Sequence, residues 1–257
     1  MKSLFSCMGL AGCLAALPVM AGGSCAVTSG ARTAALVELY TSEGCSSCPP
    51  ADRQLSRLQQ ALGPDAVVVP LSLHVDYWDY IGWKDPYAMS GFTHRQSALT
   101  AANHHRDIYT PEFFVSGSEV RDWRDDLRTA VARTNAQAVT AQIHIQAELD
   151  QKSRLILSAE ANTSRPEPTE LDLTVIEGGL SSKVNRGENQ GATLGHDHVA
   201  RAWIGPLALN AGSLSVRREI QLPPEWNRSR LEVAGFVQEK GAGRVLQAVR
   251  SQQCFGS

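Results

Sequence analysis

The sequence lacks the excess of basic residues that marks a nucleic-acid-binding protein. Its 257 residues include 24 lysines and arginines against 26 aspartates and glutamates, for a formal net charge of -2. Binding to phosphates needs a basic face, so this near balance argues against a nucleic-acid partner. Internal repeats and low-complexity tracts are also missing from the sequence. The function must therefore come from local chemistry.

Cysteine is sparse, and a second C-x-x-C is missing. The sequence has 6 cysteines, and its C-x-x-C is formed by Cys45 and Cys48. A zinc site needs four ligands, usually from a second C-x-x-C or a close histidine pair, so we predict no metal site here. A disulfide across so short a loop would constrain little of the unfolded chain. These exclusions favour redox chemistry at Cys45 and Cys48, with copper relay through the same soft thiolates as the alternative.

Residues 1–21 have the pattern of a secretory signal peptide. A basic residue at position 2 precedes an uncharged apolar run, and Val19-Met20-Ala21 supplies small or apolar residues at the cleavage site. Pro18 and the lack of a positive stop after the run disfavour a transmembrane helix. We therefore predict a periplasmic or secreted protein that is not an integral membrane protein. The stretch Leu10-Ala11-Gly12-Cys13 also resembles a bacterial lipoprotein box, and a lipid anchor at Cys13 is the alternative.

Removal of the signal peptide leaves an even set of cysteines for an oxidising compartment, namely Cys25, Cys45, Cys48 and Cys254. If Cys45 and Cys48 pair with each other, Cys25 and Cys254 remain near opposite ends of the mature chain. Chain ends often lie close together in folded proteins, so we predict a structural disulfide between Cys25 and Cys254. Free or intermolecular thiols at both positions are the alternative.

The C-x-x-C lies between a predicted strand and a predicted helix. The apolar, β-favouring run from Leu36 to Tyr40 leads into it, and Pro49-Pro50 opens a segment, 51–62, with leucines at helical spacing. A thiolate at a helix start is stabilised by unpaired N–H groups and by the helix dipole. We therefore expect Cys45 to be an exposed nucleophile with a lowered pKa, and Cys48 to be the resolving thiol.

A second predicted strand, 66–74, leads into an aromatic-rich loop. Strand, helix and strand in this order indicate a parallel βαβ unit, and sites in such sheets form at the carboxyl ends of the strands. Tyr77 and Trp78 are candidate substrate-binding residues, and a packed lid is the alternative reading of the same aromatics. His74 and Asp76 are candidates for proton transfer or metal binding, whereas a strand-end histidine bonded to backbone is the alternative.

A proline opens the next apolar stretch, which runs to Val115. Pro111 follows Thr110 and precedes a Ser116-Gly117 turn, a setting that fits a cis-proline at the start of a strand. Thioredoxin-like folds place a cis-proline loop against the active disulfide, so the upstream C-x-x-C strengthens this prediction. We expect Pro111 to belong to the catalytic site and Thr110 to present its backbone to a bound peptide.

The hydrophobic pattern changes after a predicted helix at 122–134. Alternating apolar and polar residues then predict short strands of an antiparallel, sandwich-like domain; they lie at 140–147, 154–161, 170–176, 213–222, 231–238 and 244–249. We expect the long polar loop at 181–198 to contact the first domain, while its His-x-His supplies too few ligands for a metal. The chain thus divides into a signal peptide (1–21), an α/β domain (22–136) and a β-rich domain (137–257).

These motifs together resemble a family of secreted, thioredoxin-like proteins catalogued as domain of unknown function 1223. The resemblance is carried by V-E-L-Y-T-S-E-G-C-S-S-C-P-P-A-D, by H-V-D-Y-W-D-Y-I-G-W-K-D-P and by Y-T-P-E. It implies an α/β thioredoxin-like domain followed by a mainly antiparallel β-sandwich-like domain, without an established substrate. It also maps Cys45 and Cys48 to the thioredoxin C-x-x-C, and Pro111 to its cis-proline.

The sequence as a whole favours a cell-envelope thiol-disulfide oxidoreductase that acts through Cys45 and Cys48. Its partners would be protein thiols or disulfides, and it would need no cofactor beyond its redox-active disulfide. The alternative is a binding protein: either a periplasmic copper chaperone that uses Cys45, Cys48 and His74, or a non-enzymatic module whose β-rich domain holds a partner.

Overall fold

The computed structural model describes residues 23–255, and the predicted signal peptide and Cys13 lie outside this range. The elements follow in chain order: β1 (Ser24–Thr28), β2 (Ala35–Thr41), α1 (Pro49–Ser56), α2 (Leu58–Leu62), β3 (Val68–His74), η1 (Asp79–Ile81), α3 (Ser90–Ala102), β4 (Glu112–Val115), β5 (Ser118–Glu119), α4 (Trp123–Asn135), β6 (Ala141–Leu149), β7 (Arg154–Thr163), β8 (Thr169–Glu177), β9 (Leu180–Lys183), β10 (Thr193–His196), β11 (Val199–Ala208), β12 (Ser213–Gln221), η2 (Arg228–Arg230), β13 (Leu231–Glu239) and β14 (Val245–Arg250).

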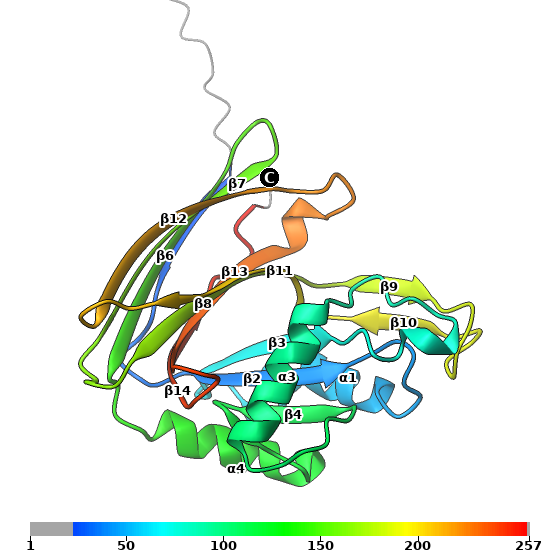
Figure 1. Ribbon diagram of the computed structural model, residues 1–257. Helices are drawn as coiled ribbons and strands as arrows, with labels where there is room; N and C mark the ends of the chain where they lie inside the picture. The colour runs from blue at the N-terminus through cyan, green and yellow to red at the C-terminus, as the bar shows by residue number, and fades with distance from the viewer. Residues whose placement is uncertain (1–22, 256–257) are drawn as a thin grey trace, which may run out of the picture.

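The described strands form three sheets (Figure 1). An eight-stranded mixed sheet has the order β14-β13-β8-β11-β3-β2-β4-β5, and a four-stranded antiparallel sheet has the order β1-β6-β7-β12. The hairpin of β9 and β10 projects from the larger sheet beside α1. Within the large sheet, β3 runs parallel to both β2 and β11.

The expected fold class, an α/β thioredoxin-like domain followed by a mainly antiparallel β-sandwich-like domain, is wrong. The structure is mostly β, with 41% strand and 19% helix. β2 and β3, which we assigned to a separate α/β domain, belong to the same eight-stranded sheet as β8, β13 and β14. The link is β11, where Val199 pairs with Ser72 and the Ser72 N–H donates to the carbonyl of His198 at 2.8 Å. This pairing covers an edge of β3 that a self-contained domain would leave open.

The predicted boundary at 136/137 falls between α4 and β6, in the connection that leads from the large sheet to the small one. The division of the chain into separate folding units there stays a prediction. The expected polar loop at 181–198 contains the β9–β10 hairpin, and the expected helix at 51–62 is interrupted at Arg57, whose φ of -100° and ψ of 4° separate α1 from α2.

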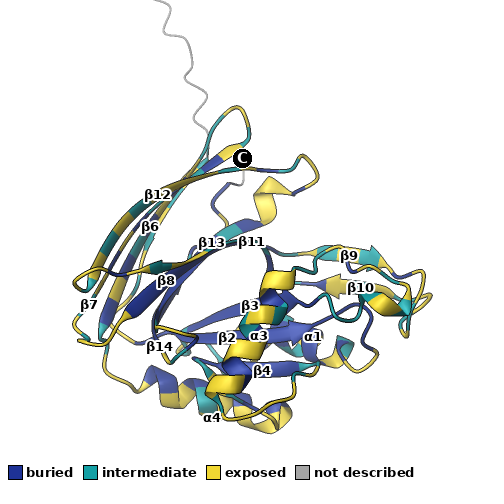
Figure 2. Ribbon diagram, viewed as in Figure 1, coloured by how far each residue is buried: buried dark blue, intermediate teal, exposed yellow. Residues whose placement is uncertain are grey.

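Helices cover both faces of the part of the large sheet that contains β2. Side chains alternate between the two faces of a strand. Leu36 and Tyr40 therefore pack toward α3, whereas Val37 and Leu39 pack toward α1 and α4. All of β2 is buried, as the dark blue strands behind α3 in Figure 2 show. A strand buried on both faces holds the C-x-x-C turn that follows it on a rigid support.

The four-stranded sheet packs on the other part of the large sheet, around β8 and β13, and the two layers curve around a shared apolar core (Figure 1). A disulfide between Cys25 and Cys254 joins its edge strand β1 to the C-terminal segment, with a Cα–Cα distance of 5.2 Å. Across residues 23–255, no helix is long and apolar enough to span a membrane.

Candidate functional site

A disulfide between Cys45 and Cys48 lies in the turn between β2 and α1. Its Cα–Cα distance is 5.4 Å, and both side chains are buried, with relative exposures of 1% for Cys45 and 0% for Cys48. The expectation of an exposed Cys45 therefore fails in this conformation. A partner molecule can reach the sulfur of Cys45 only after the groups that cover it move.

The start of α1 would stabilise a cysteine thiolate less than we expected. Cys48 is the N-cap residue, and the next two positions are Pro49 and Pro50, which carry no backbone N–H. The N–H groups of Ala51 and Asp52 donate to the carbonyl of Cys48 itself, at 2.8 and 3.1 Å. The N–H groups of the first turn are thus used by the backbone itself. Only the dipole of this short helix is left to stabilise a thiolate.

Thr110 and Pro111 lie against the disulfide. The Thr110–Pro111 peptide bond is cis, and the carbonyl oxygen of Thr110 lies 3.7 Å from Sγ of Cys45. Trp78 Nε1 donates to Oγ1 of Thr110 at 2.8 Å, which ties this aromatic residue to the segment that lies against the disulfide. Tyr77, like Trp78, is partly buried against the core cluster that includes α3, and burial raises the pKa of Tyr77 to about 12. The structure therefore brings Cys45, Thr110, Pro111 and Trp78 together, with Tyr77 next to Trp78 in the chain.

The segment between β9 and β10 covers the turn. Its Asn189 side-chain amide donates to the carbonyls of Glu43 and Cys45, at 2.8 and 2.9 Å. The neighbouring Glu188 accepts from both the backbone N–H and the hydroxyl of Ser46, at 3.0 and 2.7 Å. We call residues 184–192 the cover loop. It holds the C-x-x-C turn through hydrogen bonds to backbone atoms on both sides of Cys45.

Buried charged groups lie on the inner side of the turn. His74 Nδ1 pairs with Oδ2 of Asp85 at 2.7 Å, and the same carboxylate oxygen accepts the N–H of Glu43 at 2.8 Å. The Glu43 side chain pairs with His196 Nε2 at 3.0 Å and accepts from Trp83 Nε1 at 2.8 Å. The rings of His74 and His196 meet edge to face, with centroids 4.9 Å apart. The turn is therefore tied to β3 and to β10 by two buried acid–histidine pairs.

The pKa values of this cluster follow from burial and pairing. Burial lowers the pKa of His74, but the adjoining Asp85 carboxylate more than offsets this and leaves the pKa above its ordinary value. Burial raises the pKa of Asp85, and the charge of His74 reverses this to a net lowering. His74 and Asp85 are thus held as an ion pair. Asp52 differs, since burial raises its pKa against the opposing effect of His74 and His196.

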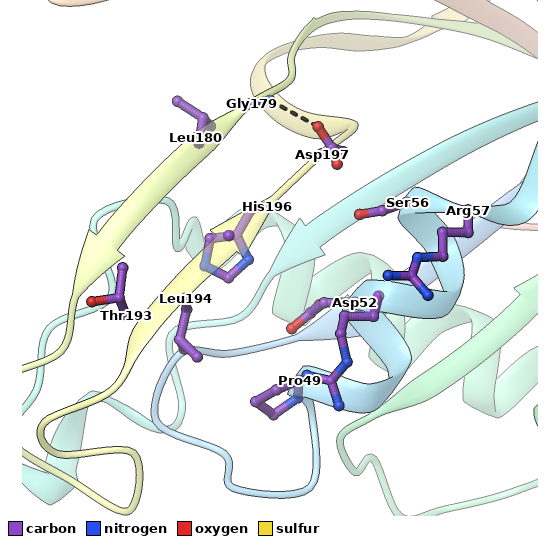
Figure 3. Close-up of a pocket in the computed structure, with 12 residues that line it drawn as sticks. Pro49, Asp52, Ser56, Arg57, Gly179, Leu180, Thr193, Leu194, His196 and Asp197 are labelled. Carbon is purple, nitrogen blue, oxygen red and sulfur yellow. Dashed lines mark hydrogen bonds between the residues drawn. The ribbon is translucent and has the colours of Figure 1, made fainter.

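A cavity of about 580 Å³ opens between α1 and the β9–β10 hairpin, with Asp52 and His196 on its inner wall (Figure 3). The two side chains project toward each other from the helix and the hairpin.

Asp76 lies elsewhere: its carboxylate accepts from the Thr93 hydroxyl at 2.6 Å, which anchors α3. Within the described part of the chain, no group of three or more His, Cys, Asp and Glu side chains is arranged to hold a metal ion. Copper binding therefore stays a prediction.

Asp52, Asp85 and Glu188 were missed by the sequence reasoning. Asp85 and Glu188 contact the turn from far along the chain, and each looks like an ordinary surface carboxylate in the sequence. For Asp52 the spacing could have predicted its place. It follows Cys48 by four positions, and residues with this spacing lie on the same face of a helix. His196 and His198, which the sequence presents as one His-x-His, are separated: His196 is buried at the site, and burial lowers the pKa of His198 to about 4 near Arg250.

Comparison with known proteins finds a family and a fold. The family model described as "Protein of unknown function (DUF1223)" matches residues 36–238. A crystal structure of a structural genomics target from Agrobacterium tumefaciens is 22% identical, with a TM-score of 0.63, and the match covers 87% of this chain and 96% of that one. HBP35 of Porphyromonas gingivalis is 14% identical, with a TM-score of 0.68 and coverage of 87% and 76%. At these identities the likeness shows the fold alone. No curated protein sequence matches.

Proposed function

The chain belongs to the family of proteins of unknown function DUF1223, and because that description names no activity, we propose a function from the site itself: thiol-disulfide exchange through Cys45 and Cys48. The observation that carries this proposal is the position of the disulfide. It lies between a rigid strand and a helix start, beside the Thr110 carbonyl and under a cover that is held by hydrogen bonds. A disulfide that served only to stabilise the fold would add little stability at this place, because it closes so short a loop.

The exchange begins from the reduced protein. The Cys45 thiolate attacks one sulfur of a partner disulfide, which forms a mixed disulfide and releases the other partner sulfur as a thiolate. Cys48 then loses its proton and attacks Sγ of Cys45, which regenerates the Cys45–Cys48 disulfide and releases the second partner thiolate. The partner thus gains two electrons, and its two thiolates take up from solvent the two protons that Cys45 and Cys48 have released. The same steps in reverse oxidise a partner dithiol.

Cys45 is assigned the first attack because polar groups from outside α1 surround it. Its Sγ lies 3.3 Å from the Ser47 hydroxyl and 3.7 Å from the Thr110 carbonyl, whereas Cys48 is fully buried at the N-cap of α1. Movement of the cover loop would uncover Cys45 first. The Thr110 backbone would then be free to contact the substrate chain. Substrates of this kind are protein thiols or disulfides of the cell envelope, and the two disulfides of the chain are compatible with such an oxidising compartment.

Reduction of insulin by dithiothreitol tests the proposal, because catalysis shortens the lag before the insulin B chain precipitates. We expect the wild-type protein to shorten the lag, and Cys45→Ser to lose the effect. The double variant Cys25→Ser/Cys254→Ser is the control, because it removes the other disulfide and leaves the C-x-x-C intact. An unchanged lag with the wild-type protein, or activity that survives Cys45→Ser, would contradict the proposal.

A further inference from the structure

One face of β8 is polar and yet buried. Glu170, Asp172 and Thr174 alternate with leucine and valine residues that point into the core shared with the four-stranded sheet. An alternating strand usually turns its polar residues to water. Here the polar residues lie under α3, and the relative exposures are 8% for Glu170 and 1% for Asp172 and Thr174. Each buried polar group therefore needs a partner.

Most of these groups are satisfied by a network that leads to α3. Arg95 donates to both carboxylate oxygens of Glu38, at 2.6 and 3.1 Å, and to the Gln238 side chain at 3.1 Å. Gln238 in turn donates to Glu170 at 2.8 Å, and Glu170 also accepts the N–H of Gly241 at 3.3 Å. The positive charge of Arg95 is thus engaged in a two-point pair with Glu38, which lies in β2.

Asp172 is the exception. Its Oδ1 accepts from Trp203 Nε1 at 2.9 Å, but its Oδ2 is buried and has no hydrogen-bond partner within residues 23–255. Gly205 gives the carboxylate its room, because a Cβ at this position, with φ of +142°, would overlap Oδ1. A buried carboxylate oxygen without a hydrogen-bond donor destabilises the fold, unless a donor from outside the chain reaches it.

Asp172 is one of the residues that line a cavity of about 460 Å³, whose size suits a small molecule. Its apolar wall is formed by α3 and the segments that face it, and includes Met89, Phe92, Ala98, Trp203, Pro206 and Ala242. Asp172, Glu170, Arg95 and Gln238 form its polar side, and His94 and Lys240 also line it. The cavity lies on the α3 side of the large sheet, whereas α1 and the C-x-x-C pack on the other side.

We propose that this cavity binds a small organic amine with an apolar body, whose ammonium group donates to Oδ2 of Asp172 while the body contacts Trp203, Phe92 and Met89. The proposal does not depend on the activity at Cys45 and Cys48. Charge favours an ammonium over other donors. Glu38 and Arg95 cancel each other, so the buried Asp172 and Glu170 leave an excess of negative charge in the interior of the site, whereas the cation Lys240 is exposed. An anionic ligand would meet this excess and find Arg95 already engaged.

A set of probes with one apolar body and different head groups tests the ligand class. Phenethylamine, 2-phenylethanol and 3-phenylpropionate are titrated into the full-length protein by isothermal calorimetry. We expect the amine to bind about ten-fold more tightly than the alcohol, since a charged hydrogen bond outweighs a neutral one by about that factor. The carboxylate should bind most weakly. Equal affinity for amine and alcohol, or no binding of any probe in the millimolar range, would overturn the proposal.

Two variants locate the binding. Asp172→Asn should reduce the affinity for the amine to that for the alcohol and leave the alcohol unchanged. Ala98→Trp places a large side chain in the cavity from an exposed position on α3, so it should abolish binding of both probes without unfolding the helix. Circular dichroism checks the fold of each variant. Amine binding that survives Ala98→Trp would place the ligand elsewhere and reject the site.

The pH dependence gives a further readout. Burial raises the pKa of Asp172 to about 6, against the opposing charge of Arg95. Amine affinity should therefore fall as the pH drops from about 7.5 to about 5, because the carboxylate gains a proton while the ammonium stays charged. The charged groups that act on Asp172 are Arg95, Glu170 and Glu38, which is paired with Arg95, and the side chains of Lys240 and His94 also line the cavity. His94→Gln should keep the fall in affinity if Asp172 causes it, and loss of the fall in this variant would contradict the assignment.

Discussion

Asn189 holds the backbone of Cys45 from 144 positions further along the chain, through a hydrogen bond of 2.9 Å to its carbonyl and a second of 2.8 Å to that of Glu43. The cover loop and the C-x-x-C turn therefore form one unit. The exchange that we propose at Cys45 requires this unit to open, and we therefore expect the strength of these hydrogen bonds to set how often the sulfur is reachable.

Asn189→Ala should speed the reduction of the Cys45–Cys48 disulfide by dithiothreitol. Loss of two hydrogen bonds, each worth about 1 kcal/mol, should raise the open population and the rate about ten-fold or more. Asn185→Ala is the matched control, because Asn185 is an exposed asparagine in the same loop. Stopped-flow measurement with alkylation of the released thiols gives the rates. Identical rates for wild type and Asn189→Ala would show that the loop does not limit access.

The pair of His74 and Asp85 should make stability depend on pH in two directions. The pKa of His74 is raised from 6.5, so its contribution is fully present below pH 6.5 and is lost as the pH rises through the higher folded-state pKa. The pKa of Asp85 is lowered from 3.8, so its contribution is present above pH 3.8 and is lost as the pH falls through the lower folded-state pKa. The pair thus stabilises most strongly between these two values.

His74→Gln should cost about 3 kcal/mol or more at weakly acidic pH, because it leaves Asp85 buried without its partner. The cost should shrink at alkaline pH, where the wild-type histidine has lost its charge. His105→Gln is the control, since His105 is 41% exposed in its pair with Glu119 and should change stability by less than about 1 kcal/mol. Urea unfolding across the pH range measures both. A cost that does not vary with pH would show that His74 acts by packing alone.

The environment of Cys45 and Cys48 predicts a disulfide that is a weak oxidant. Pro49 and Pro50 remove two N–H donors from the helix start, where they could have stabilised a thiolate. The reduced form therefore gains little stabilisation, and we expect a reduction potential below about -200 mV, as measured against glutathione. Pro50→Ala restores one N–H and should raise the potential by about 20 mV. A wild-type value near that of a strong oxidant, about -120 mV, would contradict this reasoning.

The two disulfides should contribute unequally to stability. Cys25 and Cys254 are 229 positions apart, and in the loop-closure model so long a loop is worth about 5 kcal/mol at most. Cys45 and Cys48 are 3 positions apart, which gives about 2 kcal/mol in the same model. The double alanine variant of the long-range pair should thus lower the melting temperature more than the double alanine variant of the C-x-x-C. The reverse order would mean that the C-x-x-C has a mainly structural role.

Local patterns predicted the elements better than their assembly. The strand into Cys45, the turn and the helix after it follow from the run Leu36–Tyr40 and from Pro49-Pro50, and the alternating stretches correspond to β6, β7, β8, β12, β13 and β14. The fold class failed because it depends on β11, which joins β3 to β8 by pairing that no local pattern encodes. The same limit explains why Asn189 and Asp85 were not assigned to the site. Alternation alone also does not show that a helix covers the polar face of β8.

Mixed-disulfide trapping tests the central claim, that Cys45 makes the first attack, most directly. Reduced Cys48→Ala is incubated with a protein disulfide substrate, and the adduct is mapped by mass spectrometry beside reduced Cys45→Ala as the matched control. We predict a stable mixed disulfide on Cys45, because the resolving thiol is missing, and no accumulation on Cys48 in the control. Equal adducts on both cysteines, or none on either, would contradict the account and leave the Cys45–Cys48 bond as a structural disulfide.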